Sequence, residues 1–548
     1  MSGELRPAVP SSQQVDSRLD PGVRTPGLAR DRSSPRRRGD SPVSVGRAGS
    51  WASRPAAVIV LAAGEGTRMK SRTSKVLHEL CGRTMLGHVL AAAGELEPER
   101  TIVVVGHRRE QVVAHLEGNA PAAEAVVQER QGGTGHAVRM VLEQVGELRG
   151  TVVVTNGDHP LLRGETLGRL VQTHENEGNA VTILTTEMPD ATGYGRILRE
   201  GEGGAVTAIV EHKDAHDEQR AIREINVGMY AFDGALLADA LKRVTTDNAK
   251  GEEYLTDVVA ILRGDGHRAG AFRAADWVET QGVNDKVQLA QARRQLNDRI
   301  LEAHMRAGVT VVDPQSTWID VTVTADADAV VHPGTQLHGR THLDEGAQVG
   351  PGCTLTDTRV GAGARVINAV CDSAEIGPEA SVGPFAYLRP GTRLARKAKV
   401  GAYVETKNAE VGEGGKVPHL TYVGDATIGA GANIGAGTIF ANYDGVNKFH
   451  TEIGEHAFVG SNSVLVAPVT VEDGGFTAAG STITNDVPPG AIAVARGKQR
   501  NIEEWVERKR AGTRFAEAAA KAKAKAGAEA DDVNDADDKG DDKGDDAE

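Results

Sequence analysis

Few cysteines and few aromatic residues occur in this sequence. Only three of its 548 residues are cysteine, and no two of them form a Cys-x-x-Cys pair. This number excludes a disulfide framework and gives no zinc-site pattern, which favours a reducing compartment, so we predict a cytoplasmic protein. Aromatic residues make up 3% of the chain, hydrophobic residues 39% and charged residues 25%, which is the composition of a soluble protein.

Long hydrophobic runs are also missing. The sequence has no run of about 18 apolar residues, so no membrane span is predicted. The arginines near the N-terminus are not followed by an apolar segment, so we expect no secretory signal. The net charge of −14 argues against a surface that binds nucleic acid.

Glycine, by contrast, is abundant. It accounts for 66 of the 548 residues, against a usual share of ~7%, and such an excess is typical of a repeat fold with many tight turns. A chain of this length also predicts more than one folded domain. We predict a disordered N-terminal extension, an α/β domain, a helical linker, a β-helix and a disordered acidic tail, at residues 1–54, 55–285, 286–324, 325–512 and 513–548 respectively.

Short apolar runs alternate with helix-like stretches between residues 55 and 285. Runs rich in β-branched residues lie at 57–62, 101–105 and 151–155, and a helix-like stretch at 84–96 separates the first two. This alternation predicts a Rossmann-like α/β domain with a mostly parallel sheet that is covered on both faces.

A six-residue period begins near residue 325. Aliphatic residues recur at every sixth position, for example at Val331, Leu337, Leu343, Val349 and Leu355. This hexapeptide repeat predicts a left-handed parallel β-helix, in which each aliphatic side chain stacks on its counterpart in the next coil. Breaks in the period near 360–375 and 440–452 predict two loops that leave the coil.

A glycine-rich turn at residues 61–69 (LAAGEGTRM) directly follows the first predicted strand. Backbone N–H groups of such a turn can approach phosphate oxygens. The turn lacks the Gly-Lys-Ser/Thr ending of a P-loop and does not match G-x-G-x-x-G. Arg68 and Lys75 add two positive charges beside it.

This turn resembles the signature of sugar-1-phosphate nucleotidylyltransferases, and further blocks follow in order. These blocks are Gln128 with GGTGH at 132–136, GDHPL at 157–161, GYGR at 193–196, VEHKD at 210–214, EIN at 224–226 and GVN at 282–284. Together with the repeats, they resemble the bacterial bifunctional N-acetylglucosamine-1-phosphate uridylyltransferases/glucosamine-1-phosphate acetyltransferases over residues 55–510. Two positions are atypical: Ser74 stands where the family usually has proline, and His159 occupies a variable position.

The resemblance implies synthesis of UDP-N-acetylglucosamine. Acetyl-CoA would acetylate glucosamine-1-phosphate, and UTP would then transfer its uridylyl group to N-acetylglucosamine-1-phosphate and release pyrophosphate. Asp158 and Asn284 would bind Mg²⁺, which prefers oxygen ligands, while Arg68 and Lys75 would offset charge in the transition state. The implied nucleotide- and sugar-binding residues are Leu61, Ala62, Ala63, Gly64, Lys75, Gln128, Gly133, Thr134, Gly195, Glu211, Asn226 and Asn284.

Polar residues interrupt the hexapeptide pattern in its second half. Coils of about eighteen residues place Arg389 and Lys407 one turn apart, where both could contact one phosphate. The resemblance implies that His419 is the general base of acetyl transfer, and an imidazole suits removal of a proton from a sugar ammonium. It implies acceptor binding by Arg389, Lys407, Tyr422 and Asn433, and acetyl-CoA binding by Ala436, Asn442, Tyr443, Ser461, Ala479 and Arg496. Because these residues come from separate faces, the family's homotrimer, with its site between subunits, is also implied.

Two other functions remain open from the sequence. The β-helix could serve only oligomerisation in a single-function nucleotidylyltransferase, although such a module would not need His419, Lys407 and Asn442 together. A non-catalytic sugar-nucleotide sensor is the second, although the carboxylate, amide and lysine needed for chemistry are present. We interpret three further histidines as outward coil residues rather than metal ligands, namely His332, His338 and His342.

Overall fold

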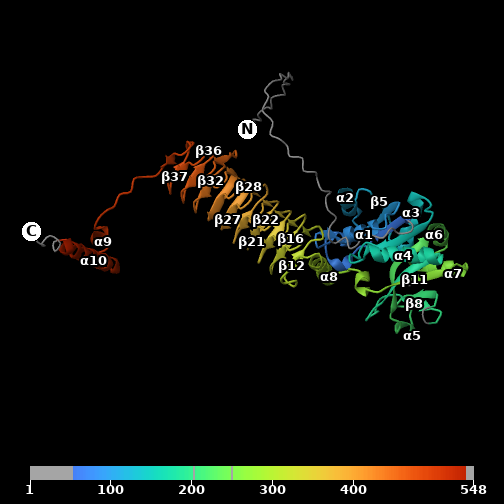
Figure 1. The fold of residues 1–548 in the computed structure, drawn as a ribbon. Helices are drawn as coiled ribbons and strands as arrows, with labels where there is room; N and C mark the ends of the chain where they lie inside the picture. Colours follow the sequence, from blue (N-terminus) through green and yellow to red (C-terminus); the bar gives the residue numbers. More distant parts are fainter. Residues whose placement is uncertain (1–53, 202–203, 249–250, 538–548) are drawn as a thin grey trace, which may run out of the picture. The chain divides into compact units, whose positions relative to one another are not determined.

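The structure is a computed structural model that describes residues 54–201, 204–248 and 251–537 (Figure 1). An α/β domain is followed along the chain by a stack of parallel coils. The predicted N-terminal extension, apart from Arg54, and the last residues of the predicted tail lie outside the described residues. Within the described ranges, no helix is long and apolar enough to cross a membrane.

The α/β domain is built on one mixed sheet. Its strands are β1 (Ala57–Ala62), β4 (Arg100–Val105), β5 (Glu124–Val127), β6 (Thr151–Asn156), β7 (Val181–Glu187), β8 (Arg196–Arg199), β9 (Val206–Val210), β10 (Glu224–Asp233) and β11 (Ala269–Ala274). The main order is β11-β7-β10-β6-β1-β4-β5, and β8 and β9 join through β10. β1 pairs in parallel with β4 and β6, whereas β10 runs antiparallel to both β6 and β7.

Helices cover both faces of this sheet, as predicted. They are α1 (Met85–Gly94), α2 (Arg109–Asn119), α3 (Thr134–Val145), α4 (Gly164–Glu177), α6 (Gly234–Leu241) and α7 (Asp257–Gly264), whereas the short helix α5 (Asp217–Arg220) buries none of its residues. Successive strand residues point to opposite faces, so Ile59 packs in the apolar cluster that includes α3, α6 and α7. Its neighbour Val60 packs in the cluster that includes α1, α2 and α4.

The second part of the chain is a left-handed β-helix made of two sheets with 11 and 17 strands. Thr324 and His342 lie 18 residues apart and occupy the same position in successive coils. The aliphatic residues of the six-residue period are fully buried, namely Val331, Leu337, Leu343, Val349 and Leu355. Their stacking confirms the hexapeptide prediction.

One predicted loop is present and the other is not. Thr358 and Ala374 occupy equivalent positions in successive coils although they are only 16 residues apart. The break near 360–375 is therefore a shortened coil, and the prediction of a loop there is wrong. The loop near 440–452 is confirmed, because the chain leaves the coil after β32 (Ile439–Ala441) and returns at β33 (Thr451–Ile453). We call residues 442–450 the insertion loop.

Helices precede and follow the coils along the chain. α8 (Lys286–Arg306) contacts the first coil through the fully buried Asn297, which donates to Thr317 O at 2.8 Å and accepts from Ile319 N at 3.0 Å. Strand pairing between coils begins at β12 (Thr310–Val311), which lies inside the range predicted as the helical linker. The domain boundaries given from the sequence remain predictions. α10 (Arg514–Asp537) is helical where a disordered tail was predicted, because alanine and lysine are strong helix formers.

Candidate active sites

Four predicted residues meet near the carboxyl ends of β1 and β6. Lys75 Nζ lies 2.6 Å from Asp158 Oδ2 and 2.8 Å from Asn284 Oδ1. Arg68 Nη2 donates to the same amide oxygen at 2.8 Å. The turn that follows β1 and the segment after it therefore present two cations, Arg68 and Lys75, to one carboxylate and one amide. A phosphate can enter this arrangement by exchanging partners.

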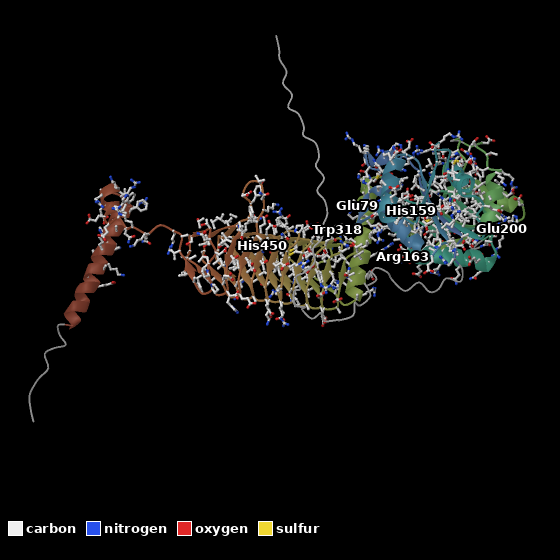
Figure 2. The ribbon with its side chains drawn as sticks, turned by 90° about the horizontal axis from the view of Figure 1, so that it is seen from above. Glu79, His159, Arg163, Glu200, Trp318 and His450 are labelled. Carbon is white, nitrogen blue, oxygen red and sulfur yellow. The ribbon has the colours of Figure 1, made fainter. Side chains whose placement is uncertain are left out.

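Asp158 is held in its charged form. Burial alone would raise the pKa of its carboxyl, but the charges of His159 and Lys75 outweigh burial and keep this pKa below its usual range. His159, labelled in the α/β domain in Figure 2, lies with Nδ1 2.8 Å from Asp158 Oδ1. No role was predicted for His159, and its place directly after Asp158 was the only signal.

A pocket of about 440 Å³ opens beside these residues. The predicted residues that line it are Leu61, Ala62, Ala63, Gly64, Lys75, Gln128, Gly133, Thr134, Asp158 and Asn284. Gln128 Nε2 donates to Gly133 O at 3.1 Å. Gly133 has a φ of +106°, and a β-carbon there would lie 2.5 Å from Glu253 O, so the wall at this point requires glycine.

An adjoining pocket of about 390 Å³ includes Leu61 and Thr134, which also line the first. Glu211 and Asn226 line this second pocket. Gly195 lies between them, since a β-carbon there would be 3.4 Å from Glu211 Oε1 and 3.7 Å from Asn226 Cβ. The residues predicted to hold the sugar therefore converge on one cavity beside the predicted nucleotide cavity.

Several further lining residues were not predicted, among them Gln131, Asn156, Tyr194 and Glu252. Asn156 ends β6 two residues before Asp158, and Tyr194 lies inside the GYGR block, so both had a signal in the sequence. Gln131 directly precedes the GGTGH block. Glu252 lies in an irregular segment without a motif, and only the fold brings it to the pocket.

The polar residues of the coils gather around Lys407. The strands β28 (Glu405–Val411) and β30 (Tyr422–Ile428) pair so that Tyr422 lies beside Glu405, and Arg389 Nη1 lies 2.9 Å from Glu405 Oε1. Lys407 lies beside Lys448 of the insertion loop, and the close approach and positive charge of Lys448 lower the pKa of the Lys407 ammonium. Two neighbouring ammonium groups favour an anion between them. Lys448 was not predicted.

His419 begins a column of predicted residues. In the strand register, Lys416 pairs with Asn433, and Asn433 pairs with Phe458. His419 therefore occupies the same coil position as Ala436 and Ser461 in later coils. The pairing of Phe458 with Phe476 extends the column to Ala479. The rungs are spaced by about 4.8 Å. Although His419 and Ala479 are far apart in sequence, the predicted general base and three predicted acetyl-CoA residues thus share one coil edge.

The remaining residues predicted for the acetyl-transfer site lie on neighbouring elements. Asn433 begins β31 (Asn433–Ile434) and is half-buried. Asn442 is buried at the start of the insertion loop, and Tyr443 is exposed within it. Arg496 is exposed after β39 (Ile492–Ala493). His450, the last residue of the insertion loop, is labelled on the coils in Figure 2.

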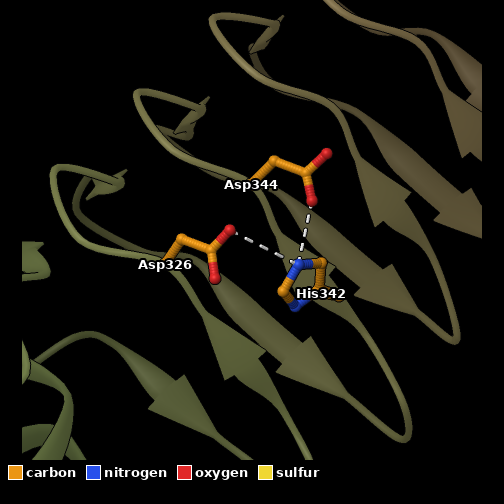
Figure 3. Close-up of side chains that lie close together, drawn as sticks. All are labelled: Asp326, His342 and Asp344. Carbon is orange, nitrogen blue, oxygen red and sulfur yellow. Dashed lines mark ion pairs between the residues drawn. The ribbon is translucent and has the colours of Figure 1, made fainter. Parts of the chain in front are cut away.

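A third cluster lies on the early coils. His342 stands between Asp326 and Asp344, with Nε2 3.9 Å from Asp326 Oδ2 and 2.9 Å from Asp344 Oδ1 (Figure 3). Its other ring nitrogen lies 2.6 Å from Thr324 Oγ1. Arg359 Nη2 also lies 2.7 Å from Asp344 Oδ1. Because hydrogen bonds and an arginine already engage these groups, the cluster is an ion-pair network that joins successive coils.

Comparisons with known proteins agree with both halves of the fold. Residues 58–256 match the model of the MobA-like NTP transferase domain. The chain is 68% identical over 467 residues to the bifunctional protein GlmU of Streptomyces avermitilis, covering 85% of this chain and 97% of that protein. It is 64% identical over 472 residues to the bifunctional protein GlmU of Thermobifida fusca, with the same two coverages. The chain therefore belongs to the family of bifunctional GlmU proteins, and it is a uridylyltransferase and acetyltransferase that makes UDP-N-acetylglucosamine.

Proposed function

We propose that the two adjoining pockets of the α/β domain hold UTP and N-acetylglucosamine-1-phosphate. Gln128, Gly133 and the turn at 61–64 line the nucleotide side, while Glu211 and Asn226 line the sugar side. A phosphate oxygen of the sugar attacks the α-phosphorus of UTP in line, and the bond to the leaving pyrophosphate breaks. The protein needs no nucleophile of its own, so its contribution is position and charge.

The oxygen atoms of Asp158 and Asn284 fit Mg²⁺. A carboxylate and an amide carbonyl are hard oxygen donors, and protein Mg²⁺ sites commonly combine one or two such groups with substrate phosphates. Bound there, Mg²⁺ would neutralise charge on the triphosphate. Lys75 and Arg68 now occupy these oxygens, and we propose that they turn to the phosphate oxygens when substrate enters.

The proposed site of acetyl transfer is the coil edge that begins at His419. The His419 imidazole removes a proton from the ammonium of glucosamine-1-phosphate, and the free amine attacks the thioester carbonyl of acetyl-CoA. The carbon–sulfur bond then breaks, and CoA leaves as the thiol. Lys407, with Lys448 beside it, binds the sugar phosphate, and the column of Ala436, Ser461 and Ala479 supports the extended arm of CoA.

Exposed apolar side chains near His419 support a homotrimer. Phe385 and Tyr403 stack with ring centroids 5.3 Å apart although 57% and 61% of each is exposed, and Leu420, next to His419, is 60% exposed. A stack of this kind favours burial against another subunit. We therefore propose that a second subunit completes the acetyl-transfer site, and light scattering of the full chain should give three times the chain mass. We also propose a cytoplasmic location, which suits three free, buried thiols.

Single substitutions in each site test the proposed function. His419→Ala should reduce release of CoA thiol from acetyl-CoA and glucosamine-1-phosphate at least about 100-fold, because the amine then lacks its base. The same protein should release pyrophosphate from UTP and N-acetylglucosamine-1-phosphate at the wild-type rate. Asp158→Ala should give the reverse pattern. Normal thiol release by His419→Ala, or normal Mg²⁺-dependent pyrophosphate release by Asp158→Ala, would reject the assigned roles.

A further inference from the structure

One corner of the coils repeats a left-handed backbone conformation. Along this corner φ is +46° at Asp357, +50° at Ser373, +82° at Gly391, +46° at Asn408 and +48° at Asp425. Asparagine and aspartate tolerate this conformation better than most residues. Backbone geometry alone therefore accounts for Asn or Asp at the corner, but not for a choice between them.

Asp425 is the middle member of a side-chain ladder. Asn408 Nδ2 lies 2.8 Å from Asp425 Oδ1, and Asn442 Nδ2 lies 2.5 Å from Asp425 Oδ2. Both neighbours are 17 residues away in sequence, which is one coil below and one coil above. Each carboxylate oxygen thus accepts one amide N–H, and the ladder connects three successive coils.

The carboxylate determines which way these amides face. A carboxylate only accepts hydrogen bonds, so both partners must turn their NH₂ groups toward Asp425. The carbonyl oxygen of Asn442 is thereby directed away from Asp425. An asparagine at position 425 would offer an acceptor oxygen to one neighbour and a donor NH₂ group to the other. The neighbour that faces the NH₂ group could then rotate its own amide so that its oxygen accepts. Only the acid fixes both amides at once.

The residues around the ladder belong to the acetyl-transfer site. Asn442 is buried and begins the insertion loop, and its backbone carbonyl oxygen accepts from Phe449 N at 2.8 Å, which closes the loop. The negative charge of Asp425 acts on Lys407 and Lys448. The ladder therefore joins the base of the insertion loop to the two lysines that would bind the sugar phosphate.

We propose that Asp425 is a positioning residue for acetyl transfer, which orients the Asn442 amide for acetyl-CoA and offsets the charge of the paired lysines. This inference rests on the proposed acetyl-transfer site. It assigns to Asp425 two separable effects. The hydrogen bond to Asn442 strengthens binding of acetyl-CoA, whereas the negative charge beside Lys407 and Lys448 weakens binding of the sugar phosphate.

Asp425→Asn separates these effects because it keeps the shape and the left-handed backbone but removes the charge. The KM for acetyl-CoA should rise about tenfold, as expected from loss of a charge-assisted hydrogen bond. The KM for glucosamine-1-phosphate should stay unchanged or fall. Asp425→Gly, which also keeps the backbone conformation, should show the same divergence. Asp357→Asn, at the same corner in a distant coil, is the matched control and should behave as wild type in both constants.

Several outcomes would overturn this role. Both KM values within about twofold of wild type in Asp425→Asn would show that only the backbone conformation matters, and a parallel rise of both would indicate a general packing defect. The pyrophosphate-releasing activity of the same chain reports whether its α/β domain is folded, and a KM for glucosamine-1-phosphate no higher than that of wild type reports that the coils are folded. His419→Ala distinguishes failure of the proposed acetyl-transfer site from failure of the positioning role. Full acetyl transfer by His419→Ala would reject the site itself. An inactive His419→Ala together with an unaltered Asp425→Asn would reject only the positioning role of Asp425.

Discussion

The lysine of the α/β site is placed by an acidic partner before any substrate binds, because Lys75 contacts Asp158 directly. A long, flexible side chain loses rotamer freedom when it is ordered, so a lysine that is already ordered loses less on binding phosphate. Asp158 thus serves to pre-organise the cation that meets the triphosphate. In the coils, by contrast, the charge of Asp425 acts on Lys407 and opposes phosphate binding.

His88 gives a prediction at the residue scale. Burial lowers the pKa of its imidazole to about 4 from its ordinary value of 6.5, and Nε2 lies 2.9 Å from Leu80 O. The folded state therefore holds a neutral ring, while the unfolded chain gains a proton below about pH 6.5. Stability from this residue is complete above that pH and is lost as the pH falls toward 4.

The effect of His88 can be isolated by comparison with His88→Gln, which keeps a donor for Leu80 O. Between pH 7 and pH 4.5, the unfolding free energy of the α/β domain should fall by about 2–3 kcal/mol more in wild type than in the variant. Urea unfolding of the full chain at the two pH values measures this difference. Parallel pH profiles would contradict a buried neutral His88.

At the scale of elements, the periodic segments could be predicted from the sequence and the irregular ones could not. The six-residue period predicted the β-helix because each inward aliphatic side chain has its own rung. The antiparallel direction of β10 could not be predicted from the sequence, since a buried strand has the same apolar pattern in either direction. Motif blocks predicted the pocket lining, whereas Glu252, Lys448 and Asp425 become neighbours of the sites only through loop and coil geometry.

The turn before α3 provides a prediction at the element scale. Gly133→Ala should lower kcat/KM for UTP by at least about tenfold, because the new methyl group meets Glu253 O and the φ of +106° is strained. Gly146→Ala, at the other end of α3, is the control. It also has a positive φ, of +84°, but nothing lies within 4 Å of its added methyl group.

Steady-state kinetics of both variants tests this account of the turn. Gly146→Ala should lose only about 1–2 kcal/mol of stability and keep its uridylyl transfer. Both proteins should retain acetyl transfer, because neither change touches the coils. Wild-type UTP kinetics in Gly133→Ala would show that the pocket wall is not fixed as described.

At the scale of the whole molecule, two chemistries occupy two separate folds in one chain. The proposed uridylyl site uses the strand ends of a mixed sheet, and the proposed acetyl site uses one edge of a coil stack. No proposed catalytic residue is common to both. The acetylated sugar phosphate made at one site is the substrate of the other, so the account requires only that it be released and bound again.

The most direct test of these independent sites is a mixture of two inactive variants. His419→Ala alone and Asp158→Ala alone should make no UDP-N-acetylglucosamine from glucosamine-1-phosphate, acetyl-CoA, UTP and Mg²⁺. Mixed together, they should restore its synthesis, because the second variant releases the acetylated sugar phosphate and the first converts it. Product from the mixture, quantified by chromatography, supports the account, and a mixture as inactive as its components would contradict it.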